Sequence, residues 1–344
     1  MLVNMLVFMI VLLIYLHVFY HLKTSNDLDI YEHDLIDKNN LEEVLNSRQP
    51  VLIDLNNNNI NTIFSFKNLS EYYKKYEINI RKNDIPNDFV DKNIKVNYSL
   101  FTDFSDNDNK YYSENNQFFL EKTGLIDELK KLDVLFKPAM TSNSSYDVLI
   151  GCNEVSTRYK YDLCFRNFLY VSDGSAVITL SPPNSEKYME CYKDYYNFEF
   201  ISSINPNLKT DEVKTKKFSK IIVNLKKGQV FHIPAYWWYS IKFDNSIITQ
   251  YKYKTYMNQL TILPEQILCF MQRQNTKKKT QNKVYKENNE LLEKTEENIV
   301  KQSIEKVEEK VEEKVEEKIE EKVEEKKNKK KKMKKLEKKS KITE

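Results

Sequence analysis

Residues 228–243 read GQVFHIPAYWWYSIKF, and this stretch decides the fold. Gly228 favours a turn, and the apolar residues after it alternate as in a short strand. Pro234 ends that strand, and the only two tryptophans of the chain, Trp237 and Trp238, begin the next one. Neighbouring residues of a strand point to opposite faces, so one indole can fill a core while the other needs cover or a partner for its N–H. The stretch predicts a corner of a β-sandwich or barrel, and a plain hairpin without chemistry is the simpler alternative.

Closely spaced strands surround this corner from residue 146 onward. They are YDVLIG, STRYKYDL, NFLYVSDG, AVITLSPP, KIIVNLKKG, QVFHIP, WWYSIKF and SIITQYKY. Alternation with regular turn signals is typical of an antiparallel sandwich or barrel. Long crossover helices are missing from this part of the sequence, which argues against a parallel α/β sheet.

The flanking segments predict a mixture of helices and short strands. Apolar spacing predicts helices over 40–45, 64–76, 116–135 and 264–274, strands over 49–55, 78–80 and 96–100, and a polar loop over 103–109. The last helix places Ile267, Leu268 and Met271 on one face, as a helix that closes the domain would.

Composition limits the function classes only loosely. The chain has 344 residues, a net charge of +3 and only 4 glycines, and its richness in Asn, Lys, Ile and Tyr indicates an AT-rich genome. The four cysteines, Cys152, Cys164, Cys191 and Cys269, fit neither a zinc motif nor a disulfide scaffold, which favours a reducing compartment. The three N-X-Ser/Thr sequons are expected by chance in so Asn-rich a chain.

The N-terminal segment is long and apolar enough to cross a membrane. Residues 2–20 read LVNMLVFMIVLLIYLHVFY, close to the length that a bilayer core requires. The alternative is a cleaved signal peptide, but no basic start precedes the run and no small-X-small site follows it. Lys23 is the only flanking positive charge, which favours a single-pass protein with its main domain in the cytosol.

The C-terminal segment is of low complexity. Glu305 to Glu325 carry a four-residue Lys-Val-Glu-Glu repeat, whose apolar stripe drifts around a helix and cannot form an ordinary coiled-coil seam. We expect a solvated helix or a disordered spacer. The lysine block Lys326–Lys341 is suited to anionic lipid or a nonspecific polyanion, and it lacks the interleaved aromatics of specific nucleic-acid recognition.

The stretch 228–243 also resembles the JmjC and cupin-like family of 2-oxoglutarate oxygenases. In that family a Gly-Asp-X-hydrophobic-X-Ile-Pro-X-X-Trp-Trp-His run ends on an iron-binding histidine, and Tyr239 stands in its place here. The family's Thr-Pro-X-His-X-Asp segment is similar to residues 157–162, where Lys160 replaces the histidine and Asp162 is kept. The resemblance therefore implies that Lys160, Asp162 and Tyr239 occupy the metal positions.

The positions for the cosubstrate are altered as well. The resemblance aligns Thr157, Asn167, Ala176 and Gln250 with family positions near 2-oxoglutarate, and Ala176 replaces the lysine that pairs with its distal carboxylate in one subgroup. A non-haem Fe(II) centre needs two imidazoles and a carboxylate on one face. Lys160 is expected to pair with Asp162, and a tyrosine is a poor ligand because its phenol must first lose a proton. The sequence thus predicts no metal site.

His232 is the one histidine within the strand region, and the simple reading is a partly buried strand residue without a catalytic role. No nucleophile–histidine arrangement and no phosphate-binding glycine loop occurs in the sequence.

We therefore expect a mainly β protein with flanking helices, built on the double-stranded β-helix of cupin and JmjC barrels. Residues 1–22 are predicted to be a transmembrane anchor, 23–48 a connector, 49–274 the cupin-like domain and 275–344 a charged tail. In composition and in its N-terminal segment the chain resembles cupin-like proteins of large DNA viruses.

Three functions follow as hypotheses. The first is a membrane-anchored, catalytically inactive cupin-like module that binds an unknown protein partner and needs no cofactor. The alternative is an Fe(II)- and 2-oxoglutarate-dependent protein hydroxylase or demethylase with non-standard ligands. The third is a membrane-bound scaffold whose working part is the charged tail.

Overall fold

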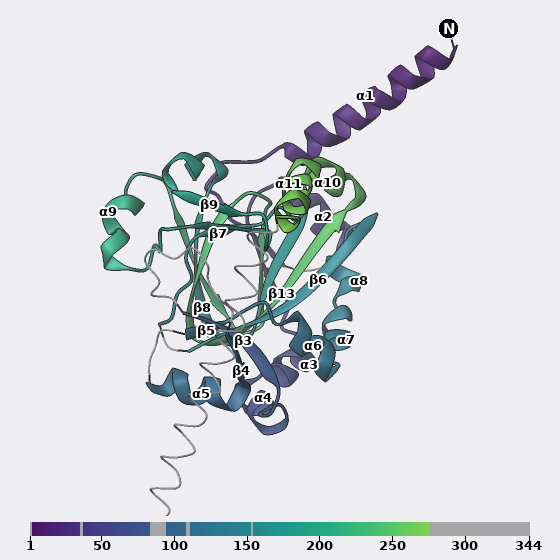
Figure 1. The fold of residues 1–344 in the computed structure, drawn as a ribbon. Helices are drawn as coiled ribbons and strands as arrows, with labels where there is room; N and C mark the ends of the chain where they lie inside the picture. Colours follow the sequence, from purple (N-terminus) through teal and green to yellow (C-terminus); the bar gives the residue numbers. More distant parts are fainter. Residues whose placement is uncertain (1, 35–36, 83–93, 108–110, 153, 276–344) are drawn as a thin grey trace, which may run out of the picture. The chain divides into compact units, whose positions relative to one another are not determined.

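Two long, bent strands, β8 (Arg166–Ser181) and β13 (Trp238–Thr255), organise the domain. In the computed structural model the described residues are 2–34, 37–82, 94–107, 111–152 and 154–275. The two strands pair antiparallel along both of their halves, with register shifts between Asp244 and Ile248. Each strand therefore contributes to two sheet layers (Figure 1).

The two layers share β8 and β13 but differ in their other strands. The first layer runs in the order β1 (Tyr31–Asp34), β2 (Val51–Asp54), β12 (Gln229–Ile233), β8, β13, β6 (Thr141–Gly151), β5 (Tyr111–Ser113), β3 (Glu77–Lys82) and β4 (Ile94–Asn97). The second layer contains β11 (Ile221–Lys226), β8, β13, β7 (Lys160–Tyr161), β10 (Glu199–Ser202) and β9 (Cys191–Asp194). Among the strand pairs of the described residues only β1 and β2 are parallel. We call the two layers together the barrel.

Two apolar cores follow from the alternation of these strands. One fills the barrel between the layers and includes Leu169, Val171, Phe231, Ile241 and Phe243. The other lies on the outer face of the first layer, where the next residues along the same strands pack against short helices. These helices are α2 (Lys38–Leu45), α3 (Asn58–Ile63), α4 (Phe66–Tyr72), α5 (Tyr98–Asn107), α6 (Gln117–Thr123), α7 (Ile126–Lys130) and α8 (Asp133–Phe136). A mainly β fold with flanking helices is confirmed.

The corner predicted from residues 228–243 is present. Gly228 adopts a φ of 92°, and a Cβ there would lie 2.9 Å from Asn56 Oδ1, so the turn requires glycine. Trp237 and Trp238 are both buried but belong to different apolar clusters, as opposite orientation requires. The indole nitrogen of Trp237 has no hydrogen-bond partner among the described residues.

Three predictions about the flanking segments were wrong in detail. The helix expected over 116–135 is split into α6, α7 and α8, because Gly124 with a φ of 75° ends the first of them. The strand expected over 96–100 ends at Asn97, and α5 follows it directly. That helix also covers most of the region predicted to be a polar loop, over 103–109.

Helices also close the two ends of the described chain. The apolar N-terminal run forms α1 (Leu2–Leu22), long and apolar enough to cross a membrane by length and composition, a test that a signal sequence also passes. At the other end α10 (Tyr256–Thr261) and α11 (Leu263–Arg273) follow β13. The short helix α9 (Glu212–Thr215) lies before β11. The predicted tail helix Glu305–Glu325 and the block Lys326–Lys341 lie outside the described residues.

Candidate functional site

A network of charged and polar side chains occupies one end of the barrel interior. Alternation along β13 directs Gln250 and Lys252 to the same interior face as Ile248, and alternation along β8 does the same for Asn167. Lys160 and Asp162 come from β7 and the residue after it, where Lys160 is registered opposite Tyr239 of β13. Long-range strand pairing therefore gathers residues from three strands around one carboxylate.

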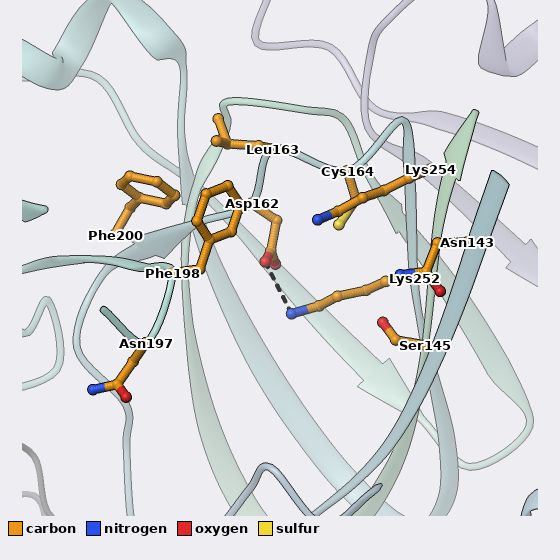
Figure 2. A pocket seen from close by; sticks show the side chains of 10 residues that line it. All are labelled: Asn143, Ser145, Asp162, Leu163, Cys164, Asn197, Phe198, Phe200, Lys252 and Lys254. Atoms are coloured by element: carbon orange, nitrogen blue, oxygen red, sulfur yellow. Dashed lines mark hydrogen bonds and ion pairs between the residues drawn. The ribbon is translucent and has the colours of Figure 1, made fainter. Parts of the chain in front are cut away.

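Asp162 is the centre of this network. Its Oδ1 accepts a hydrogen bond from the Lys252 ammonium at 2.9 Å, and its Oδ2 accepts from the Tyr239 hydroxyl at 2.7 Å and the Asn167 amide at 3.1 Å. The Gln250 amide donates to Asn167 Oδ1 at 2.9 Å and to the Tyr239 oxygen at 3.4 Å. Both carboxylate oxygens of Asp162 are thus occupied by donors of the chain itself (Figure 2 draws the bond to Lys252).

Lys160 pairs with a different carboxylate from the one predicted. Its ammonium is hydrogen-bonded to buried Glu114, which also accepts from Arg81 of β3 at 2.9 Å. Arg81 reaches Glu199 of β10 at 2.5 Å, so the chain of charges runs from the first layer to the second. The expectation that Lys160 pairs with Asp162 was wrong, because Lys252 neutralises Asp162 and leaves Lys160 for Glu114.

The pKa values follow from these pairs. Burial alone would raise the pKa of Asp162, but the Lys252 charge and the hydrogen bonds hold it below its usual range. In the same way burial would raise the pKa of Glu114, but the Lys160 and Arg81 charges lower it to about 2. Burial and the Asp162 charge raise the pKa of Tyr239 to about 12, so the phenol stays protonated at neutral pH. Burial would lower the pKa of Lys160, but the Glu114 charge raises it, so the Lys160 ammonium stays charged.

The residues aligned with the family's metal positions lie together, but they do not fit an Fe(II) centre. Lys160 presents a protonated amine, Tyr239 a protonated phenol, and Asp162 a carboxylate already bound on both oxygens. His232 is fully buried on the opposite face of β12, against Phe168, and does not face the barrel interior. Over the described part of the chain no group of three or more His, Cys, Asp or Glu side chains could hold a metal ion.

The residues aligned with cosubstrate positions separate into two pairs. Asn167 and Gln250 belong to the network around Asp162. Thr157 instead accepts a hydrogen bond from the Ile241 amide at 2.9 Å, and Ala176 is buried in the apolar core of the barrel opposite Phe243. Their assignment to family positions stays a prediction.

A cavity of about 220 Å³ opens beside Asp162 (Figure 2). Its polar lining includes Asn143 and Ser145 of β6 and Lys252 and Lys254 of β13, and its apolar lining includes Leu163, Phe198 and Phe200. The Lys254 ammonium lies 5.0 Å from the centre of the Phe198 ring and has no carboxylate partner among the described residues. The cavity therefore has one ammonium group that no carboxylate of the described residues neutralises.

Sequence reasoning missed Lys252, Lys254, Glu114 and Arg81. For the two lysines a signal existed, because strict alternation from Ile248 places them on the interior face of β13. Glu114 and Arg81 give no such signal, since the sheet register that brings β3, β5 and β7 together is not readable from local pattern.

Comparison with known families agrees with this fold. A family model described as a cupin-like domain matches residues 37–259, well over half of the chain. A search of curated proteins found no significant match.

Proposed function

Since this chain belongs to the cupin-like domain family, we propose that it is a membrane-anchored binding protein that does not use the iron chemistry found in many members. The bound ligand would enter the cavity beside Asp162.

The state of Asp162 carries the proposal. The Asp162 carboxylate accepts hydrogen bonds from Lys252, Tyr239 and Asn167, so its charge is already balanced by an ammonium group, and no imidazole of the described residues stands beside it to complete a family-type iron centre. Replacing these donors by a divalent ion would place that ion near the Lys252 and Lys160 ammonium groups. The electrostatics of the site therefore oppose a cation where the family would place one.

The lining of the cavity indicates the class of ligand. Lys254 supplies an ammonium without a carboxylate partner in the described chain, Asn143 and Ser145 supply amide and hydroxyl groups, and Phe198 and Phe200 supply aromatic faces. A carboxylate or phosphate group attached to a small flat or apolar body matches these groups. A side chain of a partner protein and a free small molecule both satisfy this description.

The contacts of α1 support anchoring by an uncleaved helix. At about 1.5 Å per residue its 21 residues span about 31 Å, close to the thickness of a bilayer core. Its last turn packs on the domain: the Tyr20 hydroxyl donates to Asn46 at 3.2 Å, and His21 lies 3.3 Å from Thr255 Oγ1. Cleavage after α1 would remove these contacts. We propose a single-pass protein with the barrel in the cytosol.

Titration of the detergent-solubilised full chain with Fe(II) and 2-oxoglutarate under anaerobic calorimetry tests the proposal. We expect no saturable heat from either, and no metal retained after desalting. Stoichiometric binding of both would contradict the proposal and favour the alternative, a 2-oxoglutarate-dependent protein hydroxylase or demethylase with non-standard ligands.

A further inference from the structure

The helix α11 exposes its apolar side and turns its polar side toward the protein. Leu263, Ile267, Phe270 and Met271 lie on one side at helical spacing, and all four are exposed. The buried residue of this helix is Cys269, on the opposite side. A helix that only closed the barrel would show the reverse pattern, so the predicted packing role is not the one observed.

This apolar side continues onto neighbouring surface. Tyr256 and Leu260 of α10 are exposed as well, and so is Met140, the residue before β6. α10 packs against α1, and Figure 1 shows α11 beside α10. We call the exposed apolar residues of α10 and α11, together with Met140, the apolar face. Exposed apolar side chains gathered on neighbouring elements are typical of an interaction site.

Two buried arginines lie beside the apolar face. The Arg48 guanidinium is centred 4.9 Å from the Tyr20 ring and 4.7 Å from the Phe165 ring, and Arg166 lies 4.4 Å from the same Phe165 ring. Neither forms an ion pair with a carboxylate in the described chain, and Arg48 Nε and Nη2 have no hydrogen-bond partner there. Burial and the Arg48 charge lower the pKa of Arg166 to about 9. A site with two cations and unused donors favours an anion.

A cavity of about 240 Å³ lies between Arg166 and Met140. It is lined by Arg166 and Phe165, by His17 and His21 of α1, and by Met140 and Met257, with Glu42 as its one acidic residue. If α1 crosses a bilayer, His17 and His21 lie at its end, at the depth of the lipid headgroups. The arginines and the apolar face then meet the membrane at the same level.

We propose that the apolar face lies on the membrane that α1 enters. We propose also that the cavity lined by Arg166, with Arg48 stacked on the same Phe165 ring, receives the phosphate of an acidic phospholipid. This inference rests on the proposed anchoring by α1. It adds a second, peripheral contact that fixes how the barrel sits on the bilayer.

Quenching of tryptophan by brominated lipid tests the apolar face. The native Trp237 and Trp238 are buried, so Phe270→Trp in the full chain adds one exposed reporter. The control is Tyr72→Trp on α4, since Tyr72 and Phe270 have nearly equal exposure, 65 % and 64 %. Both variants are placed in nanodiscs of equal parts phosphatidylglycerol and acyl-brominated phosphatidylcholine. We expect strong quenching at position 270 and none at position 72.

The outcomes separate this inference from the anchoring. If the chain enters nanodiscs but position 270 is not quenched, the inference is wrong while anchoring stands. If sedimentation then shows a dimer that Phe270→Glu dissociates, a second copy covers the face. If the chain does not enter nanodiscs at all, the anchoring and the inference both fail.

Lipid retention tests the arginines. Native mass spectrometry of the detergent-purified chain counts bound phosphatidylglycerol and phosphatidylcholine. We expect Arg48→Met to weaken retention of phosphatidylglycerol at least about tenfold, because Arg48 Nε and Nη2 have no hydrogen-bond partner in the described chain and are available to a phosphate. The surface control Lys75→Met should leave retention unchanged. Equal retention by both variants, or displacement of the lipid by inorganic phosphate alone with no quenching at position 270, would overturn the assignment to a lipid headgroup.

Discussion

Replacing Lys252 by methionine should destabilise the barrel measurably, because it leaves the Asp162 carboxylate without its cation. Removing one partner of a fully buried ion pair costs about 3–5 kcal/mol. Here Lys252 and Asp162 retain 24 % and 22 % exposure, and Asp162 keeps its bonds from Tyr239 and Asn167. We therefore expect a loss of about 2–3 kcal/mol in the free energy of unfolding. For a domain of this size that lowers Tm by about 5–10 °C.

Urea unfolding of the full chain in detergent, followed by the fluorescence of the buried Trp237 and Trp238, measures this loss. A cycle with Asp162→Asn isolates the pair, and we expect a coupling of at least about 1 kcal/mol. The control is Lys242→Met, whose pair with exposed Glu154 at 3.4 Å should be worth about 1 kcal/mol or less.

The pH dependence gives an independent check. The folded-state pKa of Asp162 is lowered, so its stabilisation is present above about pH 4 and is lost as the pH falls further. Lys252→Met should reduce this acid sensitivity. A Lys252→Met variant as stable as the native chain, or a coupling near zero, would refute the reasoning that this ion pair stabilises the barrel.

Three further predictions concern His232, Gly174 and the metal positions of the family. Burial keeps the pKa of His232 well below its usual value. Below about pH 6.5 the unfolded chain therefore takes up a proton at this residue that the folded chain does not. The free energy of unfolding should then fall by up to about 1.4 kcal/mol per pH unit. His232→Phe should remove this slope in unfolding curves between pH 7 and pH 5, and an unchanged slope would assign it elsewhere. Gly174→Ala should lower the free energy of unfolding by more than about 2 kcal/mol, because Gly174 has a φ of 71° and a Cβ would lie 1.9 Å from the Asn245 carbonyl oxygen. A Tm within about 2 °C of the native value would contradict this prediction. The triple variant Lys160→His, Tyr239→His and Lys252→Met should bind Co(II), which is detected by the visible absorption of the bound ion, while the native chain should not.

The sequence was informative where the chemistry is local. The Gly-strand-Ile-Pro-X-X-Trp-Trp pattern predicted the corner, and alternation predicted strands that the structure joins into β8 and β13. The apolar N-terminal run predicted α1. These signals are local because turn residues and side-chain alternation act over a few positions.

The charge network could not be predicted in the same way. Arg81 lies in β3 and Glu114 follows β5, and nothing near them in sequence indicates that they meet Lys160. The partner of a buried lysine depends on which carboxylate the sheet register places nearest, and that register is a property of the whole fold. The prediction for Lys160 failed for this reason. The family resemblance aligns Tyr239 and Asp162 with metal positions, and in the structure the Tyr239 hydroxyl donates a hydrogen bond to Asp162; their assignment to metal positions stays a prediction.

The separate pairing of the two lysines has an evolutionary consequence. Lys160 neutralises Glu114 and Lys252 neutralises Asp162, so each cation serves a carboxylate on a different element of the fold. A mutation that replaced either lysine alone by a metal-binding residue would leave a buried acid unpaired before any metal could bind, and such intermediates are less stable than either end state. A lineage with this barrel would therefore pass through weakened proteins if it acquired an iron site one substitution at a time.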